Sequence, residues 1–143
     1  MRVSPPLTMS TTSTPPLRPL AKPLAVCTAI YTVVLVLATH YPNPQELLEH
    51  SPIRSDKTLH FIAYGIQGLL VALTLFATGT RGFRTFAGAI VALAAFAAVD
   101  EATQPMFGRY ADVSDWAYDC IGLAGGFGLA ATVVRGRPRL PSC

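Results

Sequence analysis

Three polar stretches interrupt an otherwise apolar chain, and each carries side chains that can share protons, bind ions or form hydrogen bonds. In the first stretch, SDKTLHFIAYGIQG, Asp56, His60 and Tyr64 stand four residues apart. This interval places the three side chains on one stripe of a helix, which Gln67 and Gly68 continue. A histidine close to a carboxylate can act as a general base. The stretch therefore predicts a helix face with titratable groups.

The second and third stretches add carboxylates that a helix would place on one side. In EATQ, Glu101 and Gln104 are three residues apart at the end of an apolar run. In DVSDWAYDCIGLAGG, acidic residues and glycines recur at intervals of 3, 4, 3 and 4, at Asp112, Asp115, Asp119, Gly122 and Gly126. The two glycines form a small-xxx-small pattern, which allows helices to approach closely. Together the three stretches predict a shared polar pocket, roofed by residues 105–112.

Simpler structural roles are open for each of these residues taken alone. Helix capping by a side-chain oxygen is one such role, and it applies to Asp56, Asp112 and Ser114. Glu101 and Arg109 could form a solvated surface pair of little energetic value. His60 could be a core histidine bonded to a backbone group. The convergence of three separate segments favours a functional site over a purely structural network.

The composition indicates that membrane helices position these groups. Of the 143 residues, 51% are hydrophobic and only 13% are charged, whereas soluble domains have about 25% charged residues. Four apolar runs, near 24–41, 59–78, 83–99 and 116–134, approach or reach the roughly 20 residues of helix that cross a bilayer. We therefore predict an all-α fold, an integral membrane bundle of four transmembrane helices. A formal charge of +3 without a basic cluster argues against a nucleic-acid partner.

The ends of the chain differ from this apolar part. Residues 1–23 contain six prolines, so we predict a disordered tail there, a transmembrane domain at 24–135 and a basic tail at 136–143. The first apolar run follows Arg18 and Lys22, an arrangement that also fits a signal peptide. Because VLATHYPNP is a poor cleavage site and the run is long, we predict a retained membrane helix.

Lysine and arginine are distributed unevenly between the two predicted membrane faces. The face with both termini carries eight of them: Arg2, Arg18, Lys22, Arg81, Arg84, Arg135, Arg137 and Arg139. The opposite face carries three: Arg54, Lys57 and Arg109. Because basic loops stay in the cytoplasm, we predict a multi-pass protein of the bacterial inner membrane with both termini cytoplasmic. All eight acidic residues then lie at the outer face or just inside it.

The same three stretches resemble the VanZ-like membrane protein family. The family pattern runs D-K-x-x-H-F-x-x-Y, then E-x-x-Q, then R, then D-x-x-x-N-x-x-G. In this chain it falls on Asp56, Lys57, His60, Phe61, Tyr64, Glu101, Gln104, Arg109, Asp115, Asp119 and Gly122. The resemblance covers roughly residues 24–135, with the motifs in the expected order. Asp119 departs from the pattern, because the family commonly has asparagine there, and it adds an ionisable group to the interior face.

This resemblance implies a protein of the cell envelope, because the family's namesake is linked to resistance against the glycopeptide antibiotic teicoplanin. Our first hypothesis is that the predicted outward-facing pocket binds a cell-wall-related or lipid-linked ligand. Lys57 and Arg109 would hold an anionic group of the ligand, since a guanidinium offers a bidentate fork. Glu101, Asp115 and Asp119 would orient these two cations. Further ligand-binding candidates are Asp56, Tyr64, Gln104 and Asp119.

Two other functional classes stay open. In a membrane enzyme, His60 would be the general base and Glu101 or Asp115 would orient it, with a divalent cation as a variant. No metal-signature spacing and no activated nucleophile occurs in the sequence, and the three cysteines are scattered. We therefore predict no metal and no cofactor. In a structural or assembly subunit, the polar residues would only join the helices.

Overall fold

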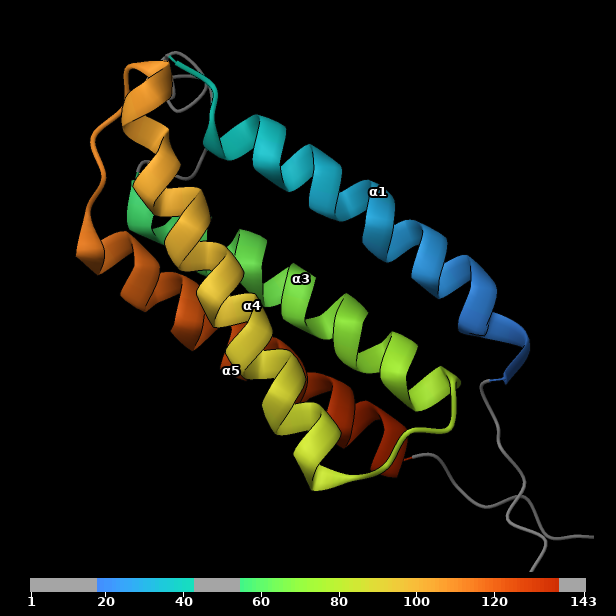
Figure 1. Ribbon diagram of the computed structural model, residues 1–143. Coiled ribbons are helices and arrows are strands. Elements are labelled where there is room, and N and C mark those ends of the chain that lie inside the picture. The colour runs from blue at the N-terminus through green and yellow to red at the C-terminus, as the bar shows by residue number, and fades with distance from the viewer. Residues whose placement is uncertain (1–17, 43–54, 137–143) are drawn as a thin grey trace, which may run out of the picture.

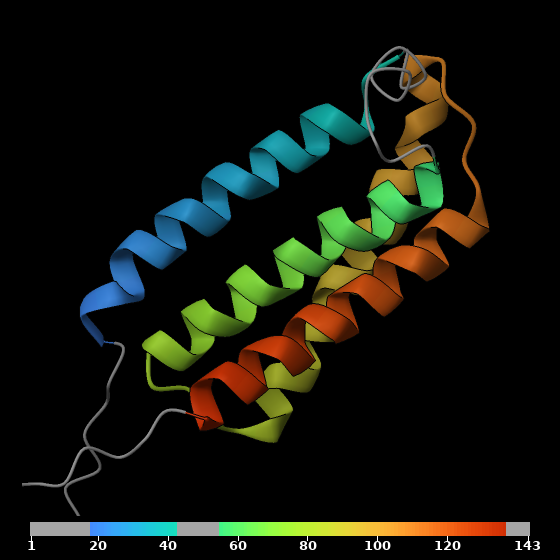
Figure 2. The ribbon, with the colours of Figure 1, turned by 180° about the vertical axis from the view of Figure 1, so that it is seen from behind.

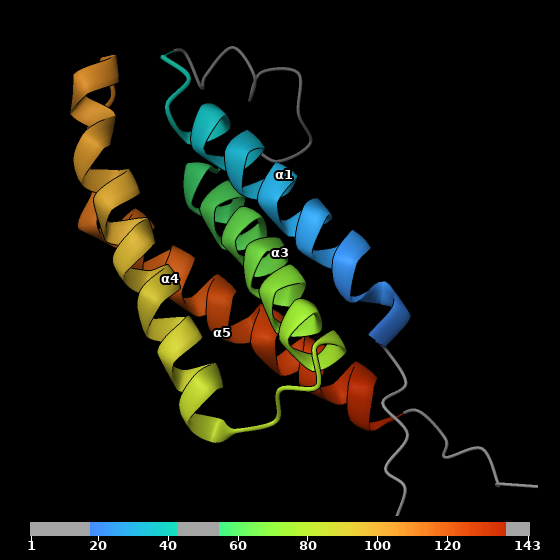
Figure 3. The same ribbon diagram turned by 45° about the vertical axis from the view of Figure 1, so that its right-hand side comes forward.

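The computed structural model describes residues 18–42 and 55–136, which are helical apart from short connections. The elements are η1 (Arg18–Leu20), α1 (Ala21–Thr39), α3 (Asp56–Ala77), α4 (Phe83–Thr103), η2 (Gln104–Phe107) and α5 (Val113–Arg135). Helices α1, α3 and α5 lie side by side, and α4 is inclined across α3 and α5 (Figure 1, Figure 2). Seen after a turn of the molecule, α3 lies between α1 and α4 (Figure 3). The all-α prediction is confirmed for these residues.

Within the described residues, four helical segments are long and apolar enough to cross a membrane. They are Arg18–Thr39, Asp56–Ala77, Phe83–Phe107 and Val113–Arg135. Large apolar side chains cover their outer surfaces, and Leu37 and Val91, for example, are each 68% exposed. An apolar surface of this extent is unfavourable in water and fits the hydrocarbon of a bilayer. The bundle is thus that of a multi-pass membrane protein.

The helices continue beyond the apolar runs that predicted them. Helix α3 begins at Asp56 and α4 ends at Thr103, because a helix that has been nucleated propagates into polar residues at little cost. The polar residues of interest therefore stand on regular helix. At the other end, η1 and the first turn of α1 include residues 18–23, which the proline content assigned to the tail. Pro23 fits there because the first N–H groups of a helix have no intrahelical partner.

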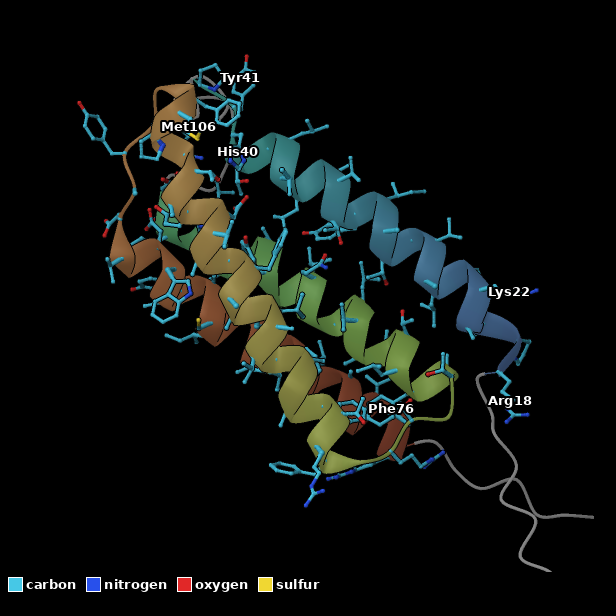
Figure 4. All side chains as sticks on the ribbon, in the orientation of Figure 1. Arg18, Lys22, His40, Tyr41, Phe76 and Met106 are labelled. Carbon is cyan, nitrogen blue, oxygen red and sulfur yellow. The ribbon has the colours of Figure 1, made fainter. Side chains whose placement is uncertain are left out.

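Charged side chains separate between the two ends of the bundle. Arg18 and Lys22 lie at the end opposite His40 and Met106 (Figure 4). The basic residues described at the first end are Arg18, Lys22, Arg81, Arg84 and Arg135. The second end, called the acidic end below, holds Asp56, Asp100, Glu101, Asp112, Asp115 and Asp119. Arg2, Arg54, Arg137 and Arg139, and both predicted tails except residues 18–23 and 136, lie outside the described residues.

Helices α3 and α5 approach until their backbones touch. A Cβ atom at Gly126 would lie 2.6 Å from the Leu69 nitrogen. At Gly122, a Cβ atom would collide with the Phe61 carbonyl oxygen. Only glycine fits at these two positions, which confirms the predicted close approach through the small-xxx-small pattern. The contact fixes the register of α5 against α3 and thereby the relative height of the polar residues on both helices.

Candidate functional site

The acidic end collects the polar residues that the sequence singled out. They belong to the N-terminal turns of α3 and α5, the C-terminal turn of α4, and the connection between α4 and α5. Six of them are buried: His60, Tyr64, Glu101, Gln104, Asp115 and Asp119. In Figure 4 the labelled side chains His40, Tyr41 and Met106 mark this end of the molecule. The convergence of three segments is therefore present in the structure.

His60 and Asp119 form a buried pair between α3 and α5. His60 Nδ1 and Asp119 Oδ1 share a hydrogen bond of 2.9 Å, and the two side chains are only 4% and 1% exposed. Asp119 thus pairs with the histidine and not with Lys57 or Arg109. The second oxygen, Asp119 Oδ2, is buried and has no hydrogen-bond partner among the described residues. Buried polar atoms are satisfied in most proteins, so this oxygen has unused binding capacity.

Glu101 is buried and forms hydrogen bonds at both ends of the connection between α4 and α5. Its Oε1 accepts a hydrogen bond of 2.6 Å from the backbone N–H of Asp112, and its Oε2 accepts one of 3.0 Å from Gln104 Nε2. Glu101 is 5% exposed and forms no ion pair with Arg109. The interpretation as a solvated surface pair is therefore wrong. The two bonds hold the start of α5 next to the end of α4.

Lys57 connects the first turn of α3 to the first turn of α5. Its Nζ lies 3.1 Å from both Asp112 Oδ2 and Asp115 Oδ1, and it also contacts Ser114 Oγ. Asp112 is the N-cap of α5, because its Oδ1 accepts a 2.8 Å hydrogen bond from the Ser114 N–H. Hydrogen bonds from the backbone and side chain of Ser114, followed by the one from Lys57, lower the pKa of Asp112 to about 2. The capping role is thus confirmed for Asp112.

Arg109 joins the α4–α5 connection to the other two helices. Its Nη2 donates to Asp56 Oδ2 at 3.0 Å, and its Nη1 donates to the Thr39 carbonyl oxygen at the end of α1 at 2.6 Å. The interpretation of Asp56 as the cap of α3 is wrong, because Ser55 is the N-cap of α3 and Asp56 is its first helical residue. The expected orienting contacts are present only in part. Of Glu101, Asp115 and Asp119, only Asp115 pairs with one of the two cations.

A second buried group, centred on Asp100, was not predicted. Asp100 Oδ1 accepts a 3.0 Å hydrogen bond from Thr39 Oγ1, and its Oδ2 accepts one of 2.9 Å from the Tyr64 hydroxyl. His40 Nδ1 lies 3.5 Å from Asp100 Oδ1, and His40 Nε2 lies 2.9 Å from Thr103 Oγ1. Tyr64, expected on the same stripe as His60, thus binds a different carboxylate. The sequence signal was weak: a Thr-His pair ends the first apolar run.

Two sets of side chains at the acidic end could hold a metal ion. One is Asp56, His60 and Asp115, and the other is His60, Glu101 and Asp119. In each set, one donor atom per residue lies within 4.8 Å of the others. The second set is buried throughout, and it contains the oxygen of Asp119 that has no partner. The acidic end therefore has two cations at its rim, Lys57 and Arg109, each paired with a carboxylate. Histidine and further carboxylates lie beneath them.

No protein-family model, no curated protein sequence and no solved structure matches this chain.

Proposed function

We propose that this chain is a VanZ-like membrane protein of the bacterial envelope whose acidic end faces outward and binds an anionic group of a lipid-linked or cell-wall-related ligand. The resemblance rests on motif residues in α3, α4 and α5, and these motifs meet at one end of the bundle. A role in glycopeptide (teicoplanin) resistance belongs to the same proposal. The orientation is supported by Arg18, Lys22, Arg81, Arg84 and Arg135 at the opposite end.

The ligand proposal rests on the partly exposed side chain of Lys57. Its side chain is 40% exposed, and its partner Asp112 is 53% exposed. Asp115, the second partner, is 9% exposed and stays beneath the ammonium group. A phosphate or carboxylate of a ligand can therefore replace Asp112 on the outer side of Lys57, while Asp115 keeps the ammonium in place.

Arg109 has a positioning role in this proposal. Its side chain is 8% exposed, and its guanidinium is already bound to Asp56 and to the Thr39 carbonyl. A guanidinium that is largely buried and already bound to two acceptors is a poor ligand contact, but it holds the connected segments together. We therefore assign ligand binding to Lys57 and the shape of the pocket to Arg109, which narrows the sequence-based interpretation in which both cations hold the ligand.

The test uses Lys57→Gln and Arg109→Lys, with Lys22→Gln and Arg84→Lys as matched controls at the basic end. Membrane abundance and teicoplanin sensitivity are measured for each variant in the native host. We expect Lys57→Gln to keep normal abundance and to lose the phenotype, because the ligand's anionic group loses its cation. Both controls should behave as wild type.

Two outcomes would contradict the proposal. If Lys57→Gln keeps full activity, the proposed ligand site at Lys57 is wrong, whatever the effect of Arg109→Lys. If abundance and phenotype fall in proportion in every variant of the acidic end, including His60→Gln and Glu101→Gln, the polar residues only hold the helices together. The structural-subunit alternative then replaces the binding function.

A further inference from the structure

We propose that His60, Glu101 and Asp119 bind one divalent transition-metal cation, Zn²⁺ or Mn²⁺, in the interior of the acidic end. This proposal replaces the sequence-based prediction of no metal. It concerns the same end of the bundle as the proposed ligand site, but it depends only on the three side chains and not on the identity of any ligand. One histidine and two carboxylates are a donor set that suits borderline divalent cations.

The spacing of the donor atoms fits one ion. One ligand atom from each of the three residues lies within 4.8 Å of the other two. Nitrogen and oxygen donors bind Zn²⁺ at about 2.0–2.2 Å, which places donors around a tetrahedral ion about 3.4 Å apart. His60 Nδ1 and Asp119 Oδ1 already lie 2.9 Å apart. Small side-chain movements therefore suffice to bring all three onto one ion.

The oxygen Asp119 Oδ2 supplies an independent reason for a ligand. Asp119 is 1% exposed, and this oxygen has no hydrogen-bond partner among the described residues. An ionised carboxylate that is buried without a full set of partners is costly. A cation in the group would satisfy the free oxygen and would keep the side chain buried.

The charge balance points the same way. Lys57 pairs with Asp112 and Asp115, and Arg109 pairs with Asp56. Over residues 18–42 and 55–136, neither Glu101 nor Asp119 forms an ion pair with a lysine or arginine. Asp119 is paired with His60, and Glu101 accepts hydrogen bonds from two uncharged donors, the Asp112 N–H and Gln104. A divalent cation compensates both charges, which is valuable at the edge of a bilayer.

The donor chemistry selects among the metals. An imidazole ligand favours Zn²⁺ and Mn²⁺ over Mg²⁺ and Ca²⁺, which take six or more oxygen ligands and keep bound water. The chain also has cysteines, two of which, Cys27 and Cys120, are described as free thiols. Because thiolates bind Zn²⁺ tightly, the test must separate coordination by His60 and the carboxylates from coordination by sulfur.

The experiment uses the full-length chain purified in detergent and stripped with EDTA. Aliquots are incubated with Zn²⁺, Mn²⁺, Mg²⁺ or Ca²⁺ and passed over a desalting column, and the retained metal is quantified by mass spectrometry. We expect about one equivalent of Zn²⁺ or Mn²⁺ and no retention of Mg²⁺ or Ca²⁺. Zn²⁺ X-ray absorption should show nitrogen and oxygen neighbours only, at about 2.0–2.2 Å.

Matched variants locate the ion. His60→Gln and Asp119→Asn should weaken Zn²⁺ binding by at least about tenfold. His40→Gln removes a half-buried histidine at the same end, and Asp112→Asn removes an exposed carboxylate. Both variants should bind Zn²⁺ as wild type. Where His60→Gln yields no folded protein by circular dichroism, Glu101→Gln takes its place. Equal loss in the controls, sulfur in the coordination shell, or no retained metal in the wild type overturns the proposal.

The metal site and the proposed ligand site would be contradicted by different results. Metal retention with a normal envelope phenotype in Lys57→Gln would disprove the ligand site and leave the metal site standing. Loss of the phenotype in Lys57→Gln, together with a wild-type chain that retains no metal, would disprove the metal site and leave the ligand site standing.

Discussion

The contact between α3 and α5 differs in kind from the contact between α1 and α3. Helices α3 and α5 meet backbone to backbone at Gly122 and Gly126, where no Cβ atom fits. Helix α1 is joined to α3 by side chains instead. The three connections are Thr28 with Thr74 at 3.1 Å, Tyr31 with the Ala63 carbonyl at 2.9 Å, and Thr32 with Gln67 at 2.9 Å.

Helices α3 and α5 therefore form a rigid pair, and α1 is attached to this pair through side chains. A close backbone contact depends on shape and tolerates almost no added atom. Hydrogen bonds between membrane helices each contribute only about 0.6 kcal/mol on average, so the loss of one connection to α1 is tolerated. The pair His60 and Asp119 spans the rigid contact. The group of Asp100, Thr39 and Tyr64 spans the side-chain contacts.

The largest expected effect follows from filling the glycine contact. Gly126→Ala adds a methyl group 2.6 Å from the Leu69 nitrogen, so we expect a loss of unfolding free energy of about 3 kcal/mol, at the upper end of over-packing costs. The measurement is denaturation of the purified chain in detergent micelles. Gly125→Ala is the matched control, because a Cβ there meets nothing within 4 Å. Equal effects of the two substitutions would contradict the close contact.

A smaller effect is expected at the junction of α1. Tyr31→Phe removes the hydroxyl that donates to the Ala63 carbonyl, and we expect it to lower the unfolding free energy by about 0.6–1 kcal/mol. Tyr110→Phe is the control, because Tyr110 is 93% exposed and should change stability by less than about 0.5 kcal/mol. A Tyr31→Phe effect as large as that of Gly126→Ala would remove the distinction between the two contacts.

The smallest effect concerns the exposed cap of α5. The pKa of Asp112 is lowered to about 2 in the fold, against about 3.9 in an unfolded chain. The stabilisation is therefore complete above about pH 4 and is lost as the pH falls toward 2. Asp112→Asn keeps a good capping residue without the charge. The difference in melting temperature between wild type and variant should shrink between pH 4 and 2, and a constant difference would refute the linkage.

Local patterns in the sequence predicted the features that depend on one helix. The apolar runs gave the four helices, and the interval between Gly122 and Gly126 indicated the close contact, because both signals repeat within a few residues. The cap at Asp112 was also predicted, although Asp56, an equally plausible cap, forms an ion pair with Arg109 instead. Capping depends on where a helix starts, and α3 starts one residue earlier, with Ser55 as its N-cap.

Contacts between side chains that are distant in the sequence could not be predicted individually. Asp119 was expected to orient Lys57 and Arg109, but the position of α5 along α3 brings it to His60 instead. Asp100 and Thr39 are 61 residues apart and share no local spacing. Their pairing depends on how near the C-terminal ends of α1 and α4 lie to each other, which periodicity does not encode. The exact contacts of the site follow from helix placement rather than from motif order.

The bond from Arg109 to the Thr39 carbonyl links positions 70 residues apart. When α1 first enters the lipid during synthesis, this partner has not yet left the ribosome. Thr39 must also wait for Asp100, and Thr32 for Gln67. Helix α1 is therefore made long before its last partner, Arg109, is available to it.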